Sequence, residues 1–353
     1  MVNIGPLLAK KIVEQLLLVQ AIFGHYNSTF HLERSLMEGI TMLDNLIGGK
    51  VLRTVSNRFF EDSHCNDILI MPSSHVTTRE MIEMARTCFN VDSADVFAAP
   101  KFASALMKGS QTVLNGIWLA VEAHEVGRII IFRNQGHDDG KIRFDQCVRA
   151  EEDKARIQGM MRAREKILSL HPGVKVLLIY GRFLNCGKQI LLSEIHPDFS
   201  ETVRLLAENR FMDELGNEIP CEATVITCMD YRQIQEVRDC VRYDFKIDRF
   251  GLIGLPGSGK RFIEDGIISW NSFYEAVEKH GSNLFFIFHH ADCGAYGGED
   301  AFNCDPIAEE LMHRAQMYHL RDMIYKRKPG VKVILVYVRF IEGKRRIRFV
   351  CFD

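Results

Sequence analysis

The amino-acid sequence predicts an α/β fold made of two homologous halves, and three observations support this prediction. Short runs rich in β-branched and aromatic residues alternate with longer segments of helical periodicity. The chain also repeats its own sequence at a nearly constant spacing. Its 353 residues are about twice the usual size of a domain. We therefore expect each half to form a mainly parallel sheet flanked by helices.

The repeat spans most of the chain. Residues 69–100 align without gaps with residues 225–256, an offset of 156 (256 − 100). Near the end of each repeat the offset grows by one residue, so that Tyr180 matches Tyr337. The predicted units are a helical N-terminal arm over residues 1–54, a first repeat over residues 55–206 and a second repeat over residues 207–353.

The second half gives the clearest alternation of elements. Strands joined through helices are parallel because a crossover connection needs a dozen or more residues, whereas a short turn makes the next strand antiparallel. Such a turn, at residues 342–344, precedes the last expected strand. The expected strands are 223–227, 249–254, 284–288, 331–337 and 345–351, and the expected helices are 233–244, 260–279 and 306–325.

The composition excludes several classes of partner. The 44 Lys and Arg residues nearly balance the 46 Asp and Glu residues, so no overall positive charge attracts nucleic acid or an anionic membrane. The apolar stretch 12–23 is short and interrupted by polar residues, which predicts an amphipathic helix rather than a membrane span or a signal sequence. Ten cysteines without a secretory signal indicate reduced thiols and a cytoplasmic location.

Two short motifs in the second half carry metal-binding chemistry. Cys228, Asp230 and Arg232 follow the first expected strand of this half, and His290 and Cys293 follow the third. Ligands of open α/β sheets bind at the carboxyl ends of the strands, where both motifs should meet. Two thiolates and one imidazole favour Zn²⁺ and leave a fourth tetrahedral position for water. Asp230 could contact the metal or its water, and Arg232 could hold that carboxylate in a charge-assisted pair.

The pattern Cys-x-Asp-x-Arg, followed some sixty residues later by His-x-x-Cys-Gly, resembles the β-class carbonic anhydrases. The resemblance covers the second half and implies that Cys228, His290 and Cys293 ligate zinc. It also implies that Asp230 and Arg232 form a catalytic dyad for the reversible hydration of carbon dioxide to bicarbonate. Members of that family work as dimers with sites near the subunit interface. The duplicated chain resembles such a dimer fused end to end, an intrachain pseudo-dimer that could assemble further into homo-oligomers.

The first half lacks the metal-binding pattern. At the same offset, the three ligand positions fall on Pro72, Asn134 and His137, and the dyad positions fall on Ser74 and Val76. His137 begins a His-Asp-Asp segment that could bind a hard metal or form a solvated loop. We therefore expect one zinc site per chain.

Other motifs admit more than one interpretation. Residues 254–260 fit a phosphate-binding loop except that Arg261 replaces the Ser or Thr that binds magnesium, and the glycines could instead permit a tight turn near the metal. His280 and His289 could relay protons or simply pack in the core. The basic turn 344–348 is expected to be a solvated hairpin face.

Three functions are compatible with the predicted metal site. The first is the hydration of carbon dioxide. The second is the hydrolysis of carbonyl sulfide or carbon disulfide at the same zinc, because attack on a linear cumulated carbon is similar in each case. The third is a non-catalytic zinc-binding scaffold or bicarbonate sensor, although structural zinc alone does not require Asp230 and Arg232.

Overall fold

The computed structural model describes most of the chain after the predicted N-terminal arm, and residues from Val51 to Asp353 form one compact unit. The arm, residues 1–54, lies almost wholly outside the described residues. The described ranges are 49–56, 65–72, 78–91, 93–98, 106, 111–135, 146–185, 188–208, 219–264, 267–278 and 280–352.

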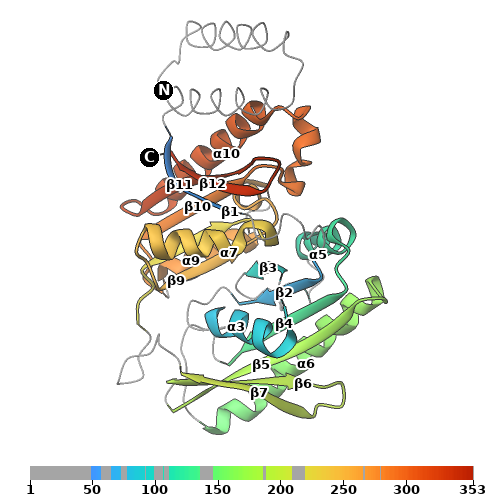
Figure 1. Ribbon diagram of the computed structural model, residues 1–353. Helices are drawn as coiled ribbons and strands as arrows, with labels where there is room; N and C mark the ends of the chain where they lie inside the picture. The colour runs from blue at the N-terminus through green and yellow to red at the C-terminus, as the bar shows by residue number, and fades with distance from the viewer. Residues whose placement is uncertain are drawn as a thin grey trace, which may run out of the picture. The chain divides into compact units, whose positions relative to one another are not determined.

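A single sheet of twelve strands runs through the described residues, in the order β1-β12-β11-β10-β8-β9-β3-β2-β4-β5-β6-β7 (Figure 1). The strands are β1 (Lys50–Ser56), β2 (Asp67–Met71), β3 (Ala94–Ala98), β4 (Arg128–Asn134), β5 (Lys175–Leu184), β6 (Gln189–Ile195), β7 (Glu201–Glu208), β8 (Ala223–Thr227), β9 (Phe250–Gly254), β10 (Leu284–His290), β11 (Lys332–Ile341) and β12 (Arg346–Cys351). Six pairs are parallel: β2–β3, β2–β4, β4–β5, β8–β9, β8–β10 and β10–β11.

The helices connect these strands. They are α3 (Thr78–Phe89), α5 (Gln111–His124), α6 (Gln146–Leu170), α7 (Tyr231–Asp239), α8 (Lys260–Glu264), α9 (Ile267–Glu278) and α10 (Pro306–Arg327), with a π-helical turn η1 (Cys240–Asp244) and 3₁₀ turns η2 (Gly294–Tyr296) and η3 (Glu299–Phe302). Among the described residues, no helix has the length and apolar character needed to cross a membrane.

The α/β prediction is confirmed, and the five strands expected in the second half are present within a few residues of their expected bounds. The helix expected over 233–244 begins earlier, at Tyr231, because Asp230 caps its amino end. The helix expected over 260–279 is instead two helices, α8 and α9. The last helix continues two residues beyond its expected end, to Arg327.

The parallel strands of the two halves meet at the centre of the sheet, where β3 pairs with β9 in antiparallel orientation. The contact is a single bridge between Ala98 and Gly254. A Cβ atom on Gly254 would lie 2.4 Å from the backbone oxygen of Val96, so only glycine allows this close approach. The halves therefore share one continuous sheet.

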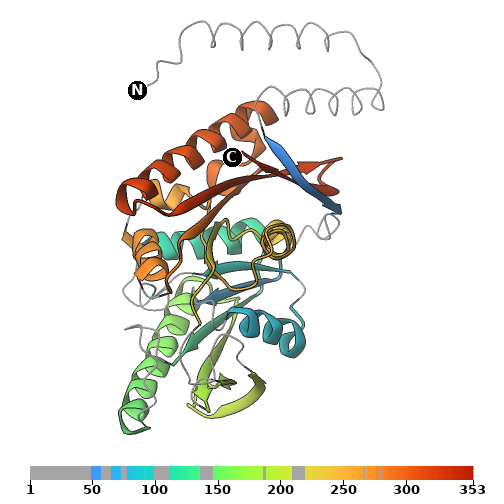
Figure 2. The same ribbon diagram turned by 90° about the vertical axis from the view of Figure 1, so that its left-hand side faces the viewer.

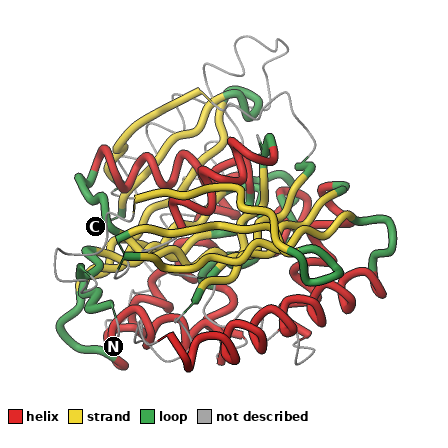
Figure 3. The backbone as a smooth tube through the Cα atoms, turned by 90° about the horizontal axis from the view of Figure 1, so that it is seen from below, coloured by secondary structure: helices red, strands yellow, loops and turns green. Residues whose placement is uncertain are grey.

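Hydrophobic side chains cover both faces of this sheet. Along β10, Phe285 and Ile287 enter one buried cluster, and Phe286 and Phe288 enter the other, as the alternation of a strand requires. The first cluster contains residues of α5, α6, α9 and α10, and the second contains residues of α3 and α7. Figures 2 and 3 show helices on both sides of the strands, with α6 and α10 on the same side in Figure 2. Such two-sided cover is typical of parallel sheets.

Candidate metal centre

Two neighbouring parallel strands bring the predicted ligands together. β8 ends at Thr227, directly before Cys228, and β10 ends at His290. These strands pair in parallel, so their carboxyl ends lie at the same edge of the sheet. Cys293 follows in the loop after β10, as the residue that precedes η2.

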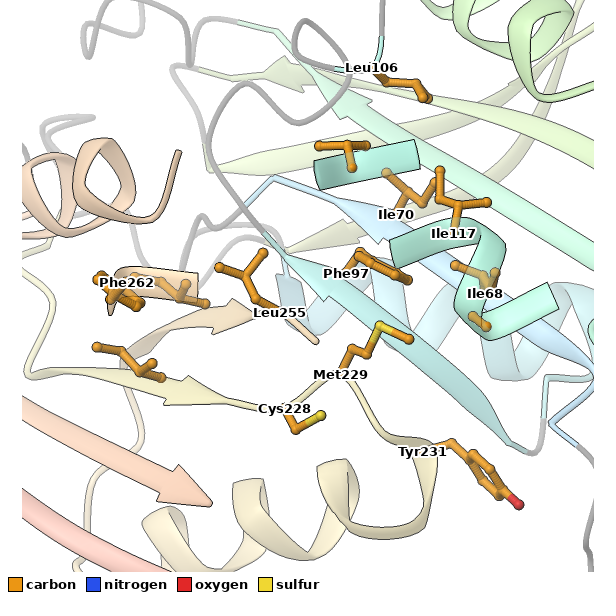
Figure 4. Close-up of a cluster of buried hydrophobic side chains, with 14 of the residues drawn as sticks. Ile68, Ile70, Phe97, Leu106, Ile117, Cys228, Met229, Tyr231, Leu255 and Phe262 are labelled. Atoms are coloured by element: carbon orange, nitrogen blue, oxygen red, sulfur yellow. The ribbon is translucent and has the colours of Figure 1, made fainter. Parts of the chain in front are cut away.

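The ligand atoms of Cys228, His290 and Cys293 all lie within 4.8 Å of one another, and the two sulfur atoms are 3.9 Å apart. The three residues are buried, with exposed fractions of 4%, 1% and 1%. Figure 4 shows Cys228 near Met229 and Leu255, and all three belong to one buried apolar cluster. Among the described residues, this is the group of His, Cys, Asp and Glu side chains whose geometry could hold a metal ion.

The chemistry of the three side chains fits a metal cation. His290 donates from Nδ1 to the backbone oxygen of Ala291 at 2.8 Å, which leaves the lone pair on Nε2. That Nε2 atom is buried and has no hydrogen-bond partner. A buried nitrogen without a partner costs free energy, whereas a bound cation would satisfy it. The set of two sulfurs and one imidazole nitrogen is the kind that zinc prefers.

The three side chains of the cluster shift the pKa values of one another. The hydrogen bond from Cys293 lowers the pKa of the Cys228 thiol, because it stabilises the thiolate. The same bond, together with burial, raises the pKa of Cys293. Burial disfavours the charged form of His290, but the Cys228 thiolate outweighs it and raises the pKa of the imidazole. The Cys228 thiolate thus favours a positive charge on the neighbouring imidazole.

A glycine-containing turn, residues 254–259, closes over the cluster from β9. Gly257 donates its backbone N–H to the Cys228 sulfur at 3.3 Å. Gly257 has a φ of 72°, which favours glycine, and a Cβ atom on it would lie 3.0 Å from the Ala295 side chain. Lys260 donates from Nζ to the backbone oxygen of Ala295 at 2.6 Å. The turn that fits a phosphate-binding loop in sequence therefore contacts the metal cluster.

Asp230 and Arg232 form the dyad that the sequence predicts, beside the cluster. Arg232 donates from Nε to both carboxylate oxygens of Asp230 at 3.0 and 3.1 Å, and from Nη2 to Oδ2 at 2.7 Å. Asp230 Oδ2 lies 3.8 Å from His290 Nε2. Although burial opposes the charge, Asp230 and Asp292 raise the pKa of Arg232 well above its ordinary value, so the guanidinium stays charged.

Two further residues, Asp292 and Lys344, belong to the hydrogen-bond network of the dyad, and the sequence did not mark them as functional. Asp292 accepts from Arg232 Nη1 at 2.7 Å, and Lys344 donates to the same Asp292 oxygen at 2.8 Å. The expectation that the basic turn is only a solvated hairpin face is therefore wrong for Lys344. It holds for Arg346, which pairs with the exposed Glu342 of the same hairpin. In the sequence, the one sign that Asp292 belongs to the site was its position between His290 and Cys293.

Three buried side chains next to the cluster, those of His289, His313 and Glu309, lie one after another. His289 accepts from the backbone N–H of Gly259 at its Nε2, and burial lowers the pKa of His289 well below its ordinary value. His289 must then carry its proton on Nδ1, which lies 3.0 Å from Nδ1 of His313. That assignment places the His313 proton on Nε2, 3.8 Å from Glu309. His289 is thus a hydrogen-bonded core residue, and His280 is buried at the other end of β10.

The first half contributes backbone and side-chain contacts to the segment 228–232, which contains Cys228 of the cluster. Val96 on β3 donates its backbone N–H to the oxygen of Met229 at 2.9 Å. Asp95, which is fully buried, accepts from the backbone N–H of Tyr231 at 3.0 Å. Both contacts hold the residues on either side of Asp230. They tie the segment 228–232 to the other half of the sheet.

The structure describes only some of the positions in the first half that align with the predicted ligands and dyad. Asn134 is buried at the end of β4, and Pro72 directly follows β2. Ser74, Val76 and His137 lie outside the described residues.

A comparison with protein families supports the interpretation of the second half as carbonic anhydrase-like. Residues 220–349 match the family model described as "Putative carbonic anhydrase". An uncharacterized protein of Rickettsia conorii is 28% identical over 117 residues, which cover 31% of this chain and 62% of the relative. An amidophosphoribosyltransferase of Lachancea kluyveri is 28% identical over 119 residues, which cover 33% of this chain and 22% of the relative. The chain thus spans less than two thirds of the length of either relative. The family match and the Cys-His-Cys cluster together support a carbonic anhydrase-like family for residues 220–349.

Proposed function

We propose that the protein is a zinc-dependent lyase of the carbonic anhydrase type, with one active centre per chain, which converts carbon dioxide and water into bicarbonate. One observation carries this proposal. A buried Cys-His-Cys cluster lies 3.8 Å from a carboxylate that an arginine holds by several hydrogen bonds. Three ligands leave an open position on a tetrahedral metal, as in catalytic rather than structural zinc sites.

Cys228, His290 and Cys293 would hold the zinc, which supplies a Lewis acid that lowers the pKa of a bound water toward about 7. Asp230 would accept a hydrogen bond from the attacking water or hydroxide at its carboxylate and so orient it, and Oδ2 is its oxygen nearest to His290 Nε2. Arg232 fixes the orientation of that carboxylate. Gly257 donates a hydrogen bond to the Cys228 sulfur, which draws electron density from the thiolate and favours a stronger Lewis acid.

We further propose that the chain is an intrachain pseudo-dimer of two homologous repeats. The strand order supports this proposal, because β3-β2-β4-β5-β6 mirrors β9-β8-β10-β11-β12. Ala98 and Gly254, which pair where the halves meet, also correspond at the offset of 156 residues.

Two buried thiols give independent support for the duplication. Cys65 and Cys221 also correspond at this offset, and each donates to the carbonyl oxygen two residues further on. Each also accepts from a backbone N–H thirty residues further on, of Asp95 and Gly251 respectively. The same local structure thus recurs in both halves.

The purified protein should hold close to one zinc per chain and accelerate carbon dioxide hydration. Elemental analysis measures the metal, and stopped-flow measurement with a pH indicator measures the hydration. Two tightly bound zincs per chain would contradict a single centre. Full zinc content without acceleration would contradict the lyase, and carbonyl sulfide as a second substrate would then separate a hydrolase from a zinc-binding scaffold or bicarbonate sensor.

The second half expressed alone, residues 207–353, should be poorly soluble or should self-associate. It lacks β1, which lies beside β12, and β3, which pairs with β9, so it exposes two unpaired strand edges and the apolar surface around them. Light scattering measures its mass, and co-expression with residues 1–206 provides the control. A stable, monomeric and fully active fragment would show that the halves are independent.

A further inference from the structure

We propose that Lys344 and Asp292 are positioning residues that keep Arg232 paired with Asp230 and thereby keep the Asp230 carboxylate off the metal. This inference rests on the proposed function, since it concerns the same centre. It assigns a role to a lysine from a distant hairpin turn that the sequence pattern of the site does not include.

Arg232 is held from two sides. Its Nε and Nη2 donate to Asp230, while Nη1 donates to the Asp292 carboxylate at 2.7 Å and Nη2 also donates to the Asp292 backbone oxygen at 2.8 Å. The guanidinium carbon lies 5.0 Å from the ring centre of Phe340. The arginine thus has a carboxylate on each edge and an aromatic ring nearby, which leaves it little freedom to turn.

Asp292 is itself fixed in a conformation that few residues adopt. Its φ is 53°, in the left-handed region that Asp tolerates better than most residues. Its backbone N–H donates to Glu309 at 2.7 Å, and its Oδ1 accepts from the backbone N–H of Glu299 at 3.2 Å. The remaining oxygen, Oδ2, receives Arg232 and Lys344 together. Asp292 therefore presents one oxygen to two cations.

Charge balance explains why the lysine matters. Without Lys344, the single positive charge of Arg232 would have to serve both Asp230 and Asp292. Lys344 adds a second positive charge beside Asp292, so Asp292 competes less with Asp230 for the charge of Arg232. Lys344 also lies 3.4 Å from Glu299, and its side chain is 40% exposed, so it enters from the solvent side.

Asp230 has an alternative partner within reach. Its Oδ2 is 3.8 Å from His290 Nε2, so the carboxylate lies near enough to this nitrogen to reach a metal that the nitrogen would hold. Asp and Glu carboxylate oxygens are ordinary zinc ligands. Weaker pairing with Arg232 therefore favours a carboxylate-bound metal, which blocks the position that the attacking water needs.

The test compares three variants of the full chain. Lys344→Met removes the charge at similar length, Lys344→Arg keeps the charge, and Arg346→Met removes a charge from the same hairpin whose partner is the exposed Glu342. The measurements are metal content, kcat and KM for carbon dioxide hydration, and the visible absorption spectrum of each protein after cobalt replaces zinc. The spectrum reports the ligands and geometry of the metal directly.

We expect Lys344→Met to retain its metal, to lose about tenfold in kcat with little change in KM, and to show an altered cobalt spectrum. Lys344→Arg should restore both properties, and Arg346→Met should match the parent protein. A Lys344→Met variant with the parent spectrum would overturn the proposal, as would a loss of metal that Lys344→Arg fails to rescue. If the parent protein does not hydrate carbon dioxide, the proposed function fails, whereas the spectra still decide the role of Lys344.

Discussion

Replacement of Cys228 by serine should leave the protein with almost no bound metal and no measurable hydration of carbon dioxide. The Cys228 sulfur lies 3.9 Å from that of Cys293, and its thiolate is favoured by the hydrogen bond from Cys293. A serine hydroxyl does not ionise near neutral pH and is a harder donor, so it replaces a thiolate poorly in a zinc site. Elemental analysis and stopped-flow hydration measure the two losses.

Cys221→Ser provides a matched control for this experiment. Cys221 is also buried, and it lies two residues before the start of the same strand, β8. Its thiol donates to a backbone oxygen, a role that a hydroxyl can keep. We expect this variant to retain metal and activity. Full metal content in Cys228→Ser would show that the cluster is not the metal site.

Replacement of Arg232 by alanine should preserve the metal but reduce kcat by about 10²- to 10⁴-fold, the usual cost of removing a group needed for proton transfer. Arg232 donates three side-chain hydrogen bonds to the Asp230 carboxylate and does not belong to the Cys-His-Cys cluster. Without it, Asp230 loses its orientation, and the buried Asp230 and partly buried Asp292 carboxylates lose their shared cation. Stopped-flow kinetics and zinc analysis on the same preparation measure both properties.

Arg232→Lys separates charge from geometry in that experiment. Lysine keeps the positive charge but cannot form the several parallel hydrogen bonds of the guanidinium. We expect it to preserve stability better than alanine while remaining much slower than the parent protein. Parent-like activity in Arg232→Ala would rule out the dyad, and loss of zinc would mean that Arg232 supports the cluster instead.

The sequence predicted those features that depend on local pattern. The strands of the second half follow from runs of β-branched and aromatic residues, and Cys228 and His290 follow directly after two of these strands. Because parallel strands end at one edge, sequence position alone was enough to expect their meeting. The same reasoning placed Asp230 and Arg232 beside them.

Contacts between distant segments could not be predicted in the same way. Lys344 looks like one of several basic residues in a turn, and its partner Asp292 is 52 residues away. Asp95 lies 136 residues from Tyr231, whose N–H it accepts, and nothing in its local sequence marks it as buried. The single bridge between Ala98 and Gly254 also depends on how the halves approach, which a repeat in sequence does not specify.

The neighbouring positions of β1 and β12 affect how the chain can reach its native state. β1 ends at Ser56 and β12 begins at Arg346, so these adjacent strands stand near opposite ends of the described chain. A ribosome makes β1 long before β12, and β1 has no β12 to pair with until the residues between them have emerged. Closing so long a loop costs chain entropy before any hydrogen bond compensates, which is typical of slow folding. The edge beside β12 is therefore completed only after β12 itself has been made, and until then the unpaired backbone of β1 is open to association with other chains.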